Sequence, residues 1–389
     1  MAPWVPSLPS PHAGGEHVYR HLEALAGHHD VTLLAPSSDP TVAAPPGVET
    51  VIIPFRPAAG PVQRVGDYLR WLLAGVGWEP RAETAARRSL AEGRHDRVLA
   101  GAHVVEAQYV ESLRLAQRVA ERAAAPVVLW SHDIVTAELR RQVRAADSFR
   151  RRAEGIARMP GAWAAERRRV RHVRGIVVFN PRESVRWRQR LDVEVKVVSP
   201  ASAAAITEPV SELGTNALLV GSFRRPANRE GLDWLAHRVW PLVRARVPTA
   251  RLLLVGSGAP QLTDEGVETV GFVPDLAPYY GRARVAVVPI FAGAGLKFRV
   301  AQALASGVPV VATHNAADGY AAPAGSGFAA VTDSPVEFAD AVVRMLTSPD
   351  EAAGIGRRGL RWWQDYVSQT SSEHELAQWY ESLADGKQV

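Results

Sequence analysis

The chain alternates short apolar runs with longer stretches of helical periodicity from end to end. In its first half, runs rich in Val and bounded by Gly, Pro or Asp predict strands that are buried on both faces. These runs lie at residues 31–35, 51–53, 97–99, 104–105, 126–130 and 176–179. Residues 17–26 and 112–124 fall between them and carry apolar positions at helical spacing. This order of strands and helices is typical of parallel βαβ units.

A second cycle of the same pattern begins after a segment that is poor in strand signals. Residues 201–215 are rich in Ala, Ser and Thr and predict a linker. Beyond the linker, strands are expected at residues 216–221, 251–255, 285–289 and 309–312, with helices between them. We therefore expect a first domain at residues 1–200 and a second at 216–370. A last helix at about 371–386 is expected to pack back on the first domain.

A chain of 389 residues exceeds what one hydrophobic core usually organises, which agrees with two domains. The expected fold class is α/β, with two doubly wound Rossmann-like domains. Open sheets of this kind bind ligands at the carboxyl ends of their strands. We therefore expect the functional residues in loops that follow strands, around a cleft between the domains.

The composition limits where the protein is expected in the cell and which kinds of chemical site it can form. No window approaches the ~20 consecutive apolar residues of a transmembrane helix. The proline-rich residues 1–15 lack the basic flank and apolar run of a secretory signal, so a cytoplasmic location is the default expectation. The chain has no Cys, which excludes disulfides and thiolate metal sites. Only the short run of residues 2–5 is available for a strand before Pro6, so the first strand is expected either to be short or to begin upstream of Met1.

Basic residues are concentrated in one segment. Residues 138–174 contain twelve Arg against four acidic residues, a net of +8; the whole chain carries +5, so the rest sums to −3. The arginines at 140–174 could meet phosphates, an acidic acceptor or, peripherally, an anionic membrane. A solvated helical face that uses Arg for solubility is the plainer interpretation. No nucleic acid partner is expected, because Trp163 is the only Trp or Tyr in the segment and no recognition motif accompanies it.

The most informative segment is residues 289–313, PIFAGAGLKFRVAQALASGVPVVAT. It predicts a strand, a loop with Gly293 and Gly295, a helix that opens with Lys297 and Arg299, and a second strand. Backbone amides beside glycine can approach an anion closely, and a helix N-terminus with two cations favours negative charge. The segment therefore predicts a diphosphate site that needs no metal; a plain turn with surface cations is the alternative.

Further informative segments are distributed over about the full chain. They are HAGGEHVYRHLEAL, HDVTLLAP, PVVLWSHD and VFNPRES in the first half, then NALLVGSFRRPANREGLDWL, ARLLLVGSG and VGFVPDLAPYYGRARVAVVPI in the second. In this order they resemble the retaining nucleotide-sugar glycosyltransferases of family 4, which have the two-domain GT-B fold. The resemblance implies transfer of a sugar, with retention of configuration, from a nucleotide diphosphate sugar to an acceptor hydroxyl. It also implies UDP as the first choice of nucleotide, and no metal or other cofactor.

The resemblance places the donor in the second domain. It implies that the nucleotide base lies beside Phe272 and Val273, although Phe272 could instead belong to the core. The diphosphate would meet Lys297, Arg299 and the amides around Gly293 and Gly295. Arg224, in the loop that follows the strand ending at Gly221, would assist unless it faces solvent.

Two departures from the family pattern put donor recognition in doubt. Family members usually carry two glutamates separated by seven residues, one at the donor sugar and one at the ribose; here these positions are Ala294 and Gln302. Gln302 can still exchange hydrogen bonds with a hydroxyl, or it is an ordinary exposed helix residue, whereas the side chain of Ala294 can make no hydrogen bond. Ser222 stands where many members have Arg.

In the first domain, the resemblance implies a glycine loop that faces the donor phosphates and the acceptor. Gly14 and Gly15 would let the backbone approach the reacting sugar, and His12 and Glu16 would line the acceptor side; a plain helix-start loop is the alternative. After the strand at 126–130, His132 is the first candidate for a catalytic contact with the donor sugar, and Asp133 is the second. A lone His in such a place is otherwise more often structural.

Three functions remain open at this stage. A glycosyltransferase is favoured; a nucleotide-sugar epimerase of the same fold would need cleft carboxylates that Ala294 makes harder to supply. A non-catalytic member that binds a nucleotide sugar is the third. The acceptor is not specified, and small metabolites, polysaccharides and lipid carriers all fit the family.

Overall fold

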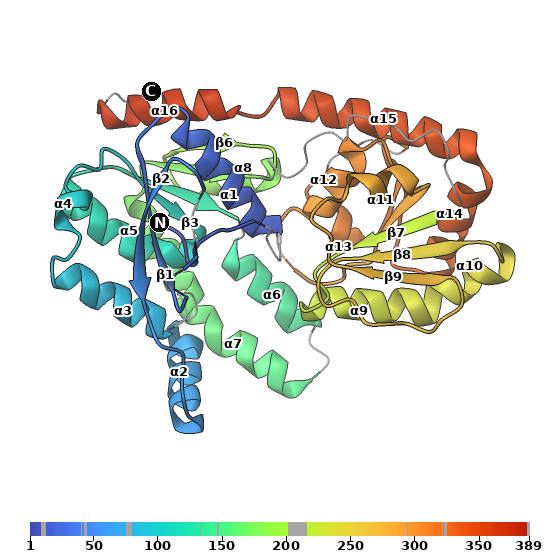
Figure 1. The fold of residues 1–389 in the computed structure, drawn as a ribbon, viewed down its shortest axis with the longest axis horizontal. Helices are drawn as coiled ribbons and strands as arrows, with labels where there is room; N and C mark the ends of the chain where they lie inside the picture. Colours follow the sequence, from blue (N-terminus) through green and yellow to red (C-terminus); the bar gives the residue numbers. More distant parts are fainter. Residues whose placement is uncertain are drawn as a thin grey trace. The chain divides into compact units, whose positions relative to one another are not determined.

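The computed structural model describes residues 1–8, 13–39, 41–42, 45–74, 80–132, 134–145, 148–200, 216–293, 295–320, 322 and 325–386. They form two compact units (Figure 1). The first contains the chain up to Val198 together with the C-terminal segment from Thr370, and the second is formed mainly by residues 216–369. The expected linker at 201–215 lies outside the described residues. The α/β class with parallel sheets agrees with the sequence analysis.

The second unit is built on a six-stranded parallel sheet in the order β12-β11-β10-β7-β8-β9. Its strands are β7 (Asn216–Val220), β8 (Arg251–Val255), β9 (Val267–Gly271), β10 (Val285–Val288), β11 (Val310–Ala312) and β12 (Phe328–Val331). Along the chain, β8 and β9 are added on one side of β7, and β10 to β12 on the other. The direction of strand addition therefore reverses between β7 and β10, which is the topological switch point of a doubly wound sheet.

Helices of the second unit pack on this sheet through buried apolar residues of β7, β8 and β10. They are α9 (Pro226–Trp234), the π-helical segment Leu235–Val239, α10 (Trp240–Arg246), α11 (Ala277–Arg282), α12 (Phe298–Ala305), α13 (His314–Ala317), α14 (Pro335–Thr347) and α15 (Pro349–Ser368). The central strands β8 and β10 are buried almost along their whole length. This burial explains why their sequences read as continuous apolar runs.

The first unit contains two parallel sheets. One pairs β1 (Val31–Ser37) with β2 (Val48–Pro54), and the other has the order β3 (Val105–Gln108), β4 (Val127–Ser131), β5 (Gly175–Val178) and β6 (Glu194–Val197). The N-terminal segment lies between them. Met1 O accepts a hydrogen bond from Gln108 N at 2.8 Å, and Ala2 N donates to Leu34 O at 3.3 Å. The short first segment therefore occupies the position where a strand was expected.

Helices of the first unit surround these sheets (Figure 1). They are α1 (Ala13–Ala26), α2 (Pro61–Ala74), α3 (Pro80–Ala91), α4 (Asp96–Leu99), α5 (Tyr109–Ala123), α6 (Val135–Ala145), α7 (Phe149–Ala164), the π-helical and 3-10 segments Ala165–Arg169 and Val170–His172, α8 (Pro181–Arg188) and α16 (Glu373–Ala384). None of the helices in the described ranges is long and apolar enough to cross a membrane.

One predicted strand is wrong. Residues 97–99 form the helical turn α4 instead, in which only Leu99 is buried. A run of three apolar or amphipathic residues is compatible with either structure and is too short to distinguish them. The Asp96 carboxylate accepts a hydrogen bond from Arg122 of α5 at 2.8 Å, which ties the turn to the neighbouring helix.

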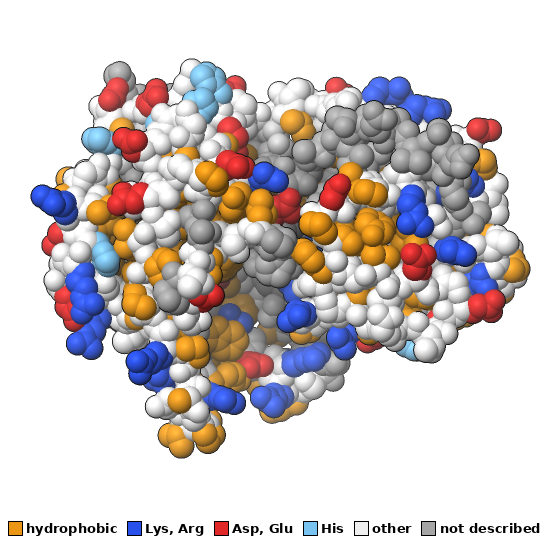
Figure 2. Space-filling view, in the orientation of Figure 1, with side chains coloured by type: hydrophobic (Ala, Val, Ile, Leu, Met, Phe, Trp, Pro, Cys, Tyr) orange, Lys and Arg blue, Asp and Glu red, His pale blue; other side chains and the backbone are white. Residues whose placement is uncertain are grey.

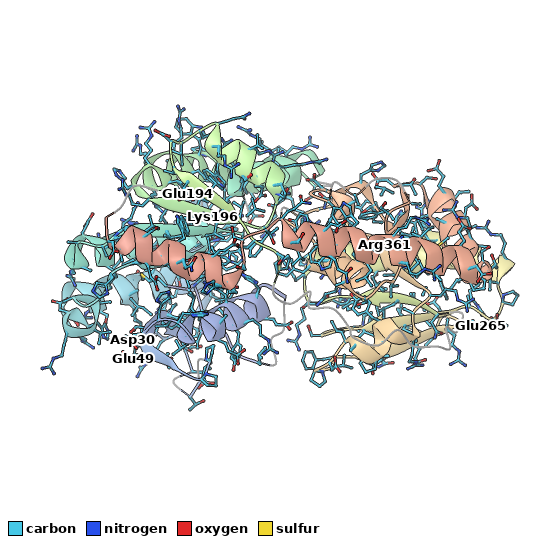
Figure 3. All side chains as sticks on the ribbon, turned by 90° about the horizontal axis from the view of Figure 1, so that it is seen from above. Asp30, Glu49, Glu194, Lys196, Glu265 and Arg361 are labelled. Atoms are coloured by element: carbon cyan, nitrogen blue, oxygen red, sulfur yellow. The ribbon has the colours of Figure 1, made fainter. Side chains whose placement is uncertain are left out.

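Helix α16 packs on the first unit. A capping box of Ser372 and Glu375 begins the helix. On its buried face, Tyr380 accepts a hydrogen bond from Trp130 Nε1 at 2.8 Å. Trp379 Nε1 donates to Glu194 Oε2 at 2.6 Å, on the β6 strand that also carries Lys196 (Figure 3). The last helix of the chain therefore covers the sheet formed by residues 105–197.

A buried ionic network joins α1, β3 and α16. His21 is fully buried, with Nε2 2.9 Å from Glu106 Oε2 and Nδ1 3.1 Å from Glu373 Oε2. Burial opposes protonation of His21, but the two carboxylates outweigh it and raise its pKa to about 10. Burial likewise opposes ionisation of Glu106, but the His21 charge and its hydrogen bond lower the pKa of Glu106 to about 2. Tyr380 donates a further hydrogen bond to Glu106 Oε2 at 2.7 Å.

We expect His21→Gln to lower the free energy of unfolding by about 3 kcal/mol at pH 6, because it leaves a buried carboxylate without its cation. The pKa of His21 is raised from 6.5, so its contribution is fully present below pH 6.5 and is lost as the pH rises through 10. The pKa of Glu106 is lowered from 4.5, so its contribution is lost as the pH falls from 4.5 towards 2. Urea unfolding from pH 5 to 10 should show the difference between parent and variant shrinking above pH 7. The exposed His237→Gln is the control, and a difference that stays constant with pH would contradict the charge assignment.

Candidate active site

The switch point of the second unit brings together most of the predicted donor residues. The loop after β7 contains Gly221 and Arg224, and the loop after β10 leads through Gly293 and Gly295 to α12. Both loops leave the carboxyl edge of the sheet, and β7 and β10 are hydrogen-bonded neighbours. This is the edge at which open α/β sheets bind their ligands.

Arg299, in the first turn of α12, lies against the end of β7. Its Nη2 donates to Asn228 Oδ1 at 3.1 Å. A Cβ at Gly221 would lie 3.0 Å from Nη1, so the guanidinium needs the space that glycine leaves. Nη1 is buried and has no hydrogen-bond partner in the part of the chain that the structure describes. Burial lowers the pKa of Arg299 to about 10, which still leaves it charged at neutral pH.

A buried cationic N–H without a partner is costly, because the loss of hydration is not compensated. An anion at the carboxyl edge of β7 would remove this cost by accepting from Nη1. The position of Arg299 is therefore the strongest geometric indication of an anion site in the second unit.

The loop before α12 holds its shape through glycine conformations and internal hydrogen bonds. Gly293 and Gly295 have φ of +114° and +74°, which other residues rarely adopt. Lys297 Nζ donates to Gly293 O at 2.9 Å and to Gly295 O at 2.8 Å. Tyr320 OH donates to Lys297 O at 2.9 Å. The Lys297 ammonium is thus folded onto its own loop and would exchange these carbonyls for an anion. Ala294 lies outside the described residues.

The other predicted donor residues are placed as follows. Phe272 is 47% exposed and directly follows the end of β9, so it is not a core residue. Val273 is half-buried beside it. Gln302 is half-buried, with Oε1 3.5 Å from the Tyr280 hydroxyl, and is therefore not an ordinary exposed residue. Arg224 is exposed.

In the first unit, His132 directly follows β4 and is buried. Its Nε2 lies 2.7 Å from Gln108 Oε1, and Gln108 Nε2 donates to Glu106 Oε1 at 2.6 Å. Because the Gln108 amide group donates to Glu106, its oxygen is the acceptor for His132. This arrangement selects the tautomer of His132 that carries its proton on Nε2.

Two residues that the sequence analysis did not select pack on His132. The Tyr109 ring stacks on the imidazole with centroids 3.7 Å apart and planes 9° apart. Tyr109 has φ +68°, an unusual conformation for a bulky residue that tertiary contacts must maintain. His17 of α1 lies 6.1 Å from His132, ring to ring. Burial, together with His132 and His21, holds the pKa of His17 well below its usual value. Tyr109 directly follows a strand, as His132 does, and this position in the sequence could have identified it as a candidate site residue.

The predicted glycine loop is partly helical. Gly14, Gly15 and Glu16 belong to the first turn of α1, which begins at Ala13 rather than at residue 17. Burial raises the pKa of Glu16, against the effect of Arg20. His12 and Asp133 lie outside the described residues. Of the predicted site residues, His132 and Glu16 belong to the first unit, and Arg299 and Lys297 belong to the second.

No group of three or more His, Asp or Glu side chains that could hold a metal ion occurs among the residues described by the structure. The cations at the switch point include Lys297 and Arg299, with Arg224 and Arg225 in the neighbouring loop.

We expect Arg299→Met to leave the unfolding free energy of the ligand-free protein within about 1 kcal/mol of the parent, because it removes a buried charge that is not fully paired. The same variant should lose the rise in melting temperature that pyrophosphate gives the parent protein. Differential scanning fluorimetry with 0–10 mM pyrophosphate measures both effects. Arg238→Met, at an exposed position of the same unit, should respond to pyrophosphate as the parent does. An undiminished response of Arg299→Met would place the anion elsewhere.

Comparison with known proteins shows which family and which fold the chain resembles. Residues 214–348 match the family described as glycosyl transferases group 1. No curated protein sequence matches the chain. The match covers the strands β7 to β12 and includes both loops of the switch point.

Solved structures resemble the whole chain. Sucrose-phosphate synthase from Thermosynechococcus elongatus is 19% identical, with a TM-score of 0.69 over 96% of this chain and 94% of that one. Anabaena HepE, in complex with UDP and glucose, is 12% identical, with a TM-score of 0.60 over 97% of each chain. WaaG, a glycosyltransferase involved in lipopolysaccharide biosynthesis, is 14% identical, with a TM-score of 0.60 over 96% of each chain. The chain thus has the GT-B fold of two Rossmann-like domains, and together with the match of residues 214–348 this supports a glycosyltransferase.

Proposed function

We propose that the chain is a retaining, metal-independent glycosyltransferase that transfers a sugar from a nucleotide diphosphate sugar to an acceptor hydroxyl. The observation that carries the proposal is the Arg299 guanidinium at the switch point, within the segment that matches group 1; its buried Nη1 has no partner among the described residues. UDP is the proposed nucleotide, because structures of the same fold are described with UDP and glucose or with UDP-2-fluoro glucose.

The donor is proposed to bind along the carboxyl edge of the second sheet. Arg299 and Lys297 would hold the diphosphate, with the amide of Gly295 approaching from the loop. The exposed Phe272 ring would pack on the base, and Gln302 would hydrogen-bond the ribose. Gln302 can do so without a charge, because an amide both donates to and accepts from a hydroxyl.

Chemistry would depend on positioning and on electrostatic stabilisation. The acceptor oxygen forms a bond to the anomeric carbon while the bond from that carbon to the diphosphate breaks, and the nucleotide diphosphate leaves. Holding the two reactants together supplies much of the rate, and the two cations stabilise the developing charge on the leaving group. His132, held by Gln108 and Tyr109, would contact the donor sugar; Glu16 would lie on the acceptor side. The positive end of α12 with Lys297 and Arg299 would replace a metal ion.

A non-catalytic nucleotide-sugar-binding protein is the alternative that one specific observation favours. Gln302 replaces one of the family's two acidic residues, and Ala294 replaces the other. Such a protein would bind the nucleotide but form no product, so binding and transfer must be measured separately.

UDP should raise the melting temperature of the protein, and the rise should survive EDTA. A ligand at 100 times its Kd adds about 2.7 kcal/mol of stability, which scanning fluorimetry resolves. UDP, GDP, dTDP and ADP are compared, each with and without EDTA. Loss of the shift in EDTA would overturn metal independence, and a stronger response to another nucleotide would overturn the choice of UDP. If none of the four nucleotides gives a shift, the proposed donor site is wrong.

His132→Ala should lower the rate of sugar transfer by about 10²–10³-fold, because it removes a polar contact with the reacting sugar. Its UDP-induced thermal shift should equal that of the parent, since His132 belongs to the first unit. Transfer from UDP-sugars to a panel of hydroxyl acceptors, followed by NMR of the anomeric proton, gives both the rate and the configuration. The exposed His237→Ala is the control. Full activity of His132→Ala would remove His132 from the mechanism, and an inverted product would exclude retention.

A further inference from the structure

Helix α7 exposes its large apolar side chains instead of burying them. Phe149, Ile156 and Trp163 are 89%, 55% and 48% exposed. They follow one another at steps of seven residues, so they form one stripe along the helix. Helices of globular proteins normally turn such a stripe towards the core. Here the buried positions of α7 are the small residues Gly155 and Ala162.

The packing of α7 accounts for its other faces. Its packing neighbours include α6 and α2, and it continues into the π-helical segment Ala165–Arg169. A Cβ at Gly155 would lie 2.6 Å from Val143 Cγ2, so the small face is pressed against α6. On a second face, the Arg158 guanidinium lies 3.9 Å above the Trp71 ring of α2. Phe149, Ile156 and Trp163 project from neither of these faces and remain exposed to solvent.

Arginines border the exposed stripe at both ends. Arg150, Arg151 and Arg152 directly follow Phe149 and are exposed. Arg167 lies 4.8 Å above the Trp163 ring and is followed by the exposed Arg168. Figure 2 shows Lys and Arg side chains interspersed with hydrophobic ones over the part of the first unit where Figure 1 places α2 and α7.

We propose that this stripe, with its bordering arginines, docks on the surface of an anionic lipid bilayer. Aromatic and aliphatic side chains enter the interfacial region of a bilayer, while Arg remains among the headgroups. Each basic residue near an anionic surface adds to the attraction. The helix would lie in the plane of the interface, with Phe149, Ile156 and Trp163 directed towards the acyl chains.

Other occupants of the stripe fit less well. In a two-fold dimer, the same surface would meet itself and bring the arginines of both copies together. A nucleic acid would accept the arginines, but Ile156 has no π-face on which a base could stack. A bilayer is the occupant that uses both the aliphatic and the cationic side chains. This inference does not depend on the proposed transfer reaction.

Co-sedimentation of the full chain with vesicles tests the proposal. The parent should partition into vesicles of 30% phosphatidylglycerol in phosphatidylcholine at least tenfold more strongly than into pure phosphatidylcholine, and less strongly as the salt concentration rises. The triple variant Phe149→Gln, Ile156→Gln, Trp163→Gln should lose at least about tenfold in partition coefficient, since it removes the apolar surface that enters the bilayer. A second variant, with Arg150, Arg151 and Arg152 changed to Gln, should lose about 100-fold on the anionic vesicles.

Matched controls separate docking from general surface effects. Val336→Gln changes a side chain of α14 that is 58% exposed, and Arg238→Gln changes an exposed arginine; both should bind as the parent does. Circular dichroism checks that the triple variants are folded. Three results would each overturn the proposal: no binding of the parent to anionic vesicles, equal binding by the apolar triple variant, or a change from dimer to monomer in that variant without any effect of lipid. Sedimentation velocity measures the last.

Discussion

A charge that is buried must be compensated, and in the second unit this requirement acts on the Arg299 guanidinium. Asn228 accepts one of its hydrogen bonds, Gly221 leaves room for the group, and Nη1 has no partner in the ranges that the structure describes. The protein maintains this arrangement at the carboxyl edge of the sheet, next to the point between β7 and β10 where the direction of strand addition reverses. Natural folds tolerate such an unfavourable feature where a ligand offsets it. The geometry of the loops and the electrostatics of the site therefore both indicate an anionic ligand.

In the first unit, two buried histidines of the same helix differ in charge. His17 and His21 lie one helical turn apart on α1, yet burial keeps the first neutral and two carboxylates keep the second charged. The charged imidazole lies between Glu106 and Glu373, where it joins the sheet to α16. The neutral His17 faces His132 and Phe179, near the carboxyl ends of β4 and β5. Helix α1 thus carries a charged imidazole on the side that faces Glu106 and Glu373, and a neutral imidazole on the side that faces His132.

Sequence patterns predicted the central strands and the switch-point loops well, because those strands are buried on both faces and consist of continuous apolar runs. The strands β6 and β9 were not predicted, since their half-exposed residues mix charged or polar positions with apolar ones. Strand β12 was not predicted either; it has four residues, and two of them are alanines with little strand preference. Residues 97–99 were too few to distinguish a strand from a turn. Among the site residues, Lys297 and Arg299 could be chosen from their place at a helix start. The stacking of Tyr109 on His132, and the hydrogen bonds of Gln108, depend on contacts between separate strands that no local pattern encodes.

The chain leaves the first unit after Val198 and returns to it only at Thr370. During synthesis, the ribosome therefore releases most of the first unit long before α16 exists. At 5–20 residues per second, the remaining segment takes roughly 10–40 s to make. Throughout that interval Trp130 and Glu106 lack the hydroxyl of Tyr380, and His21 lacks Glu373. The nascent first unit must persist in an incomplete state, and its folding is completed only when the last helix emerges.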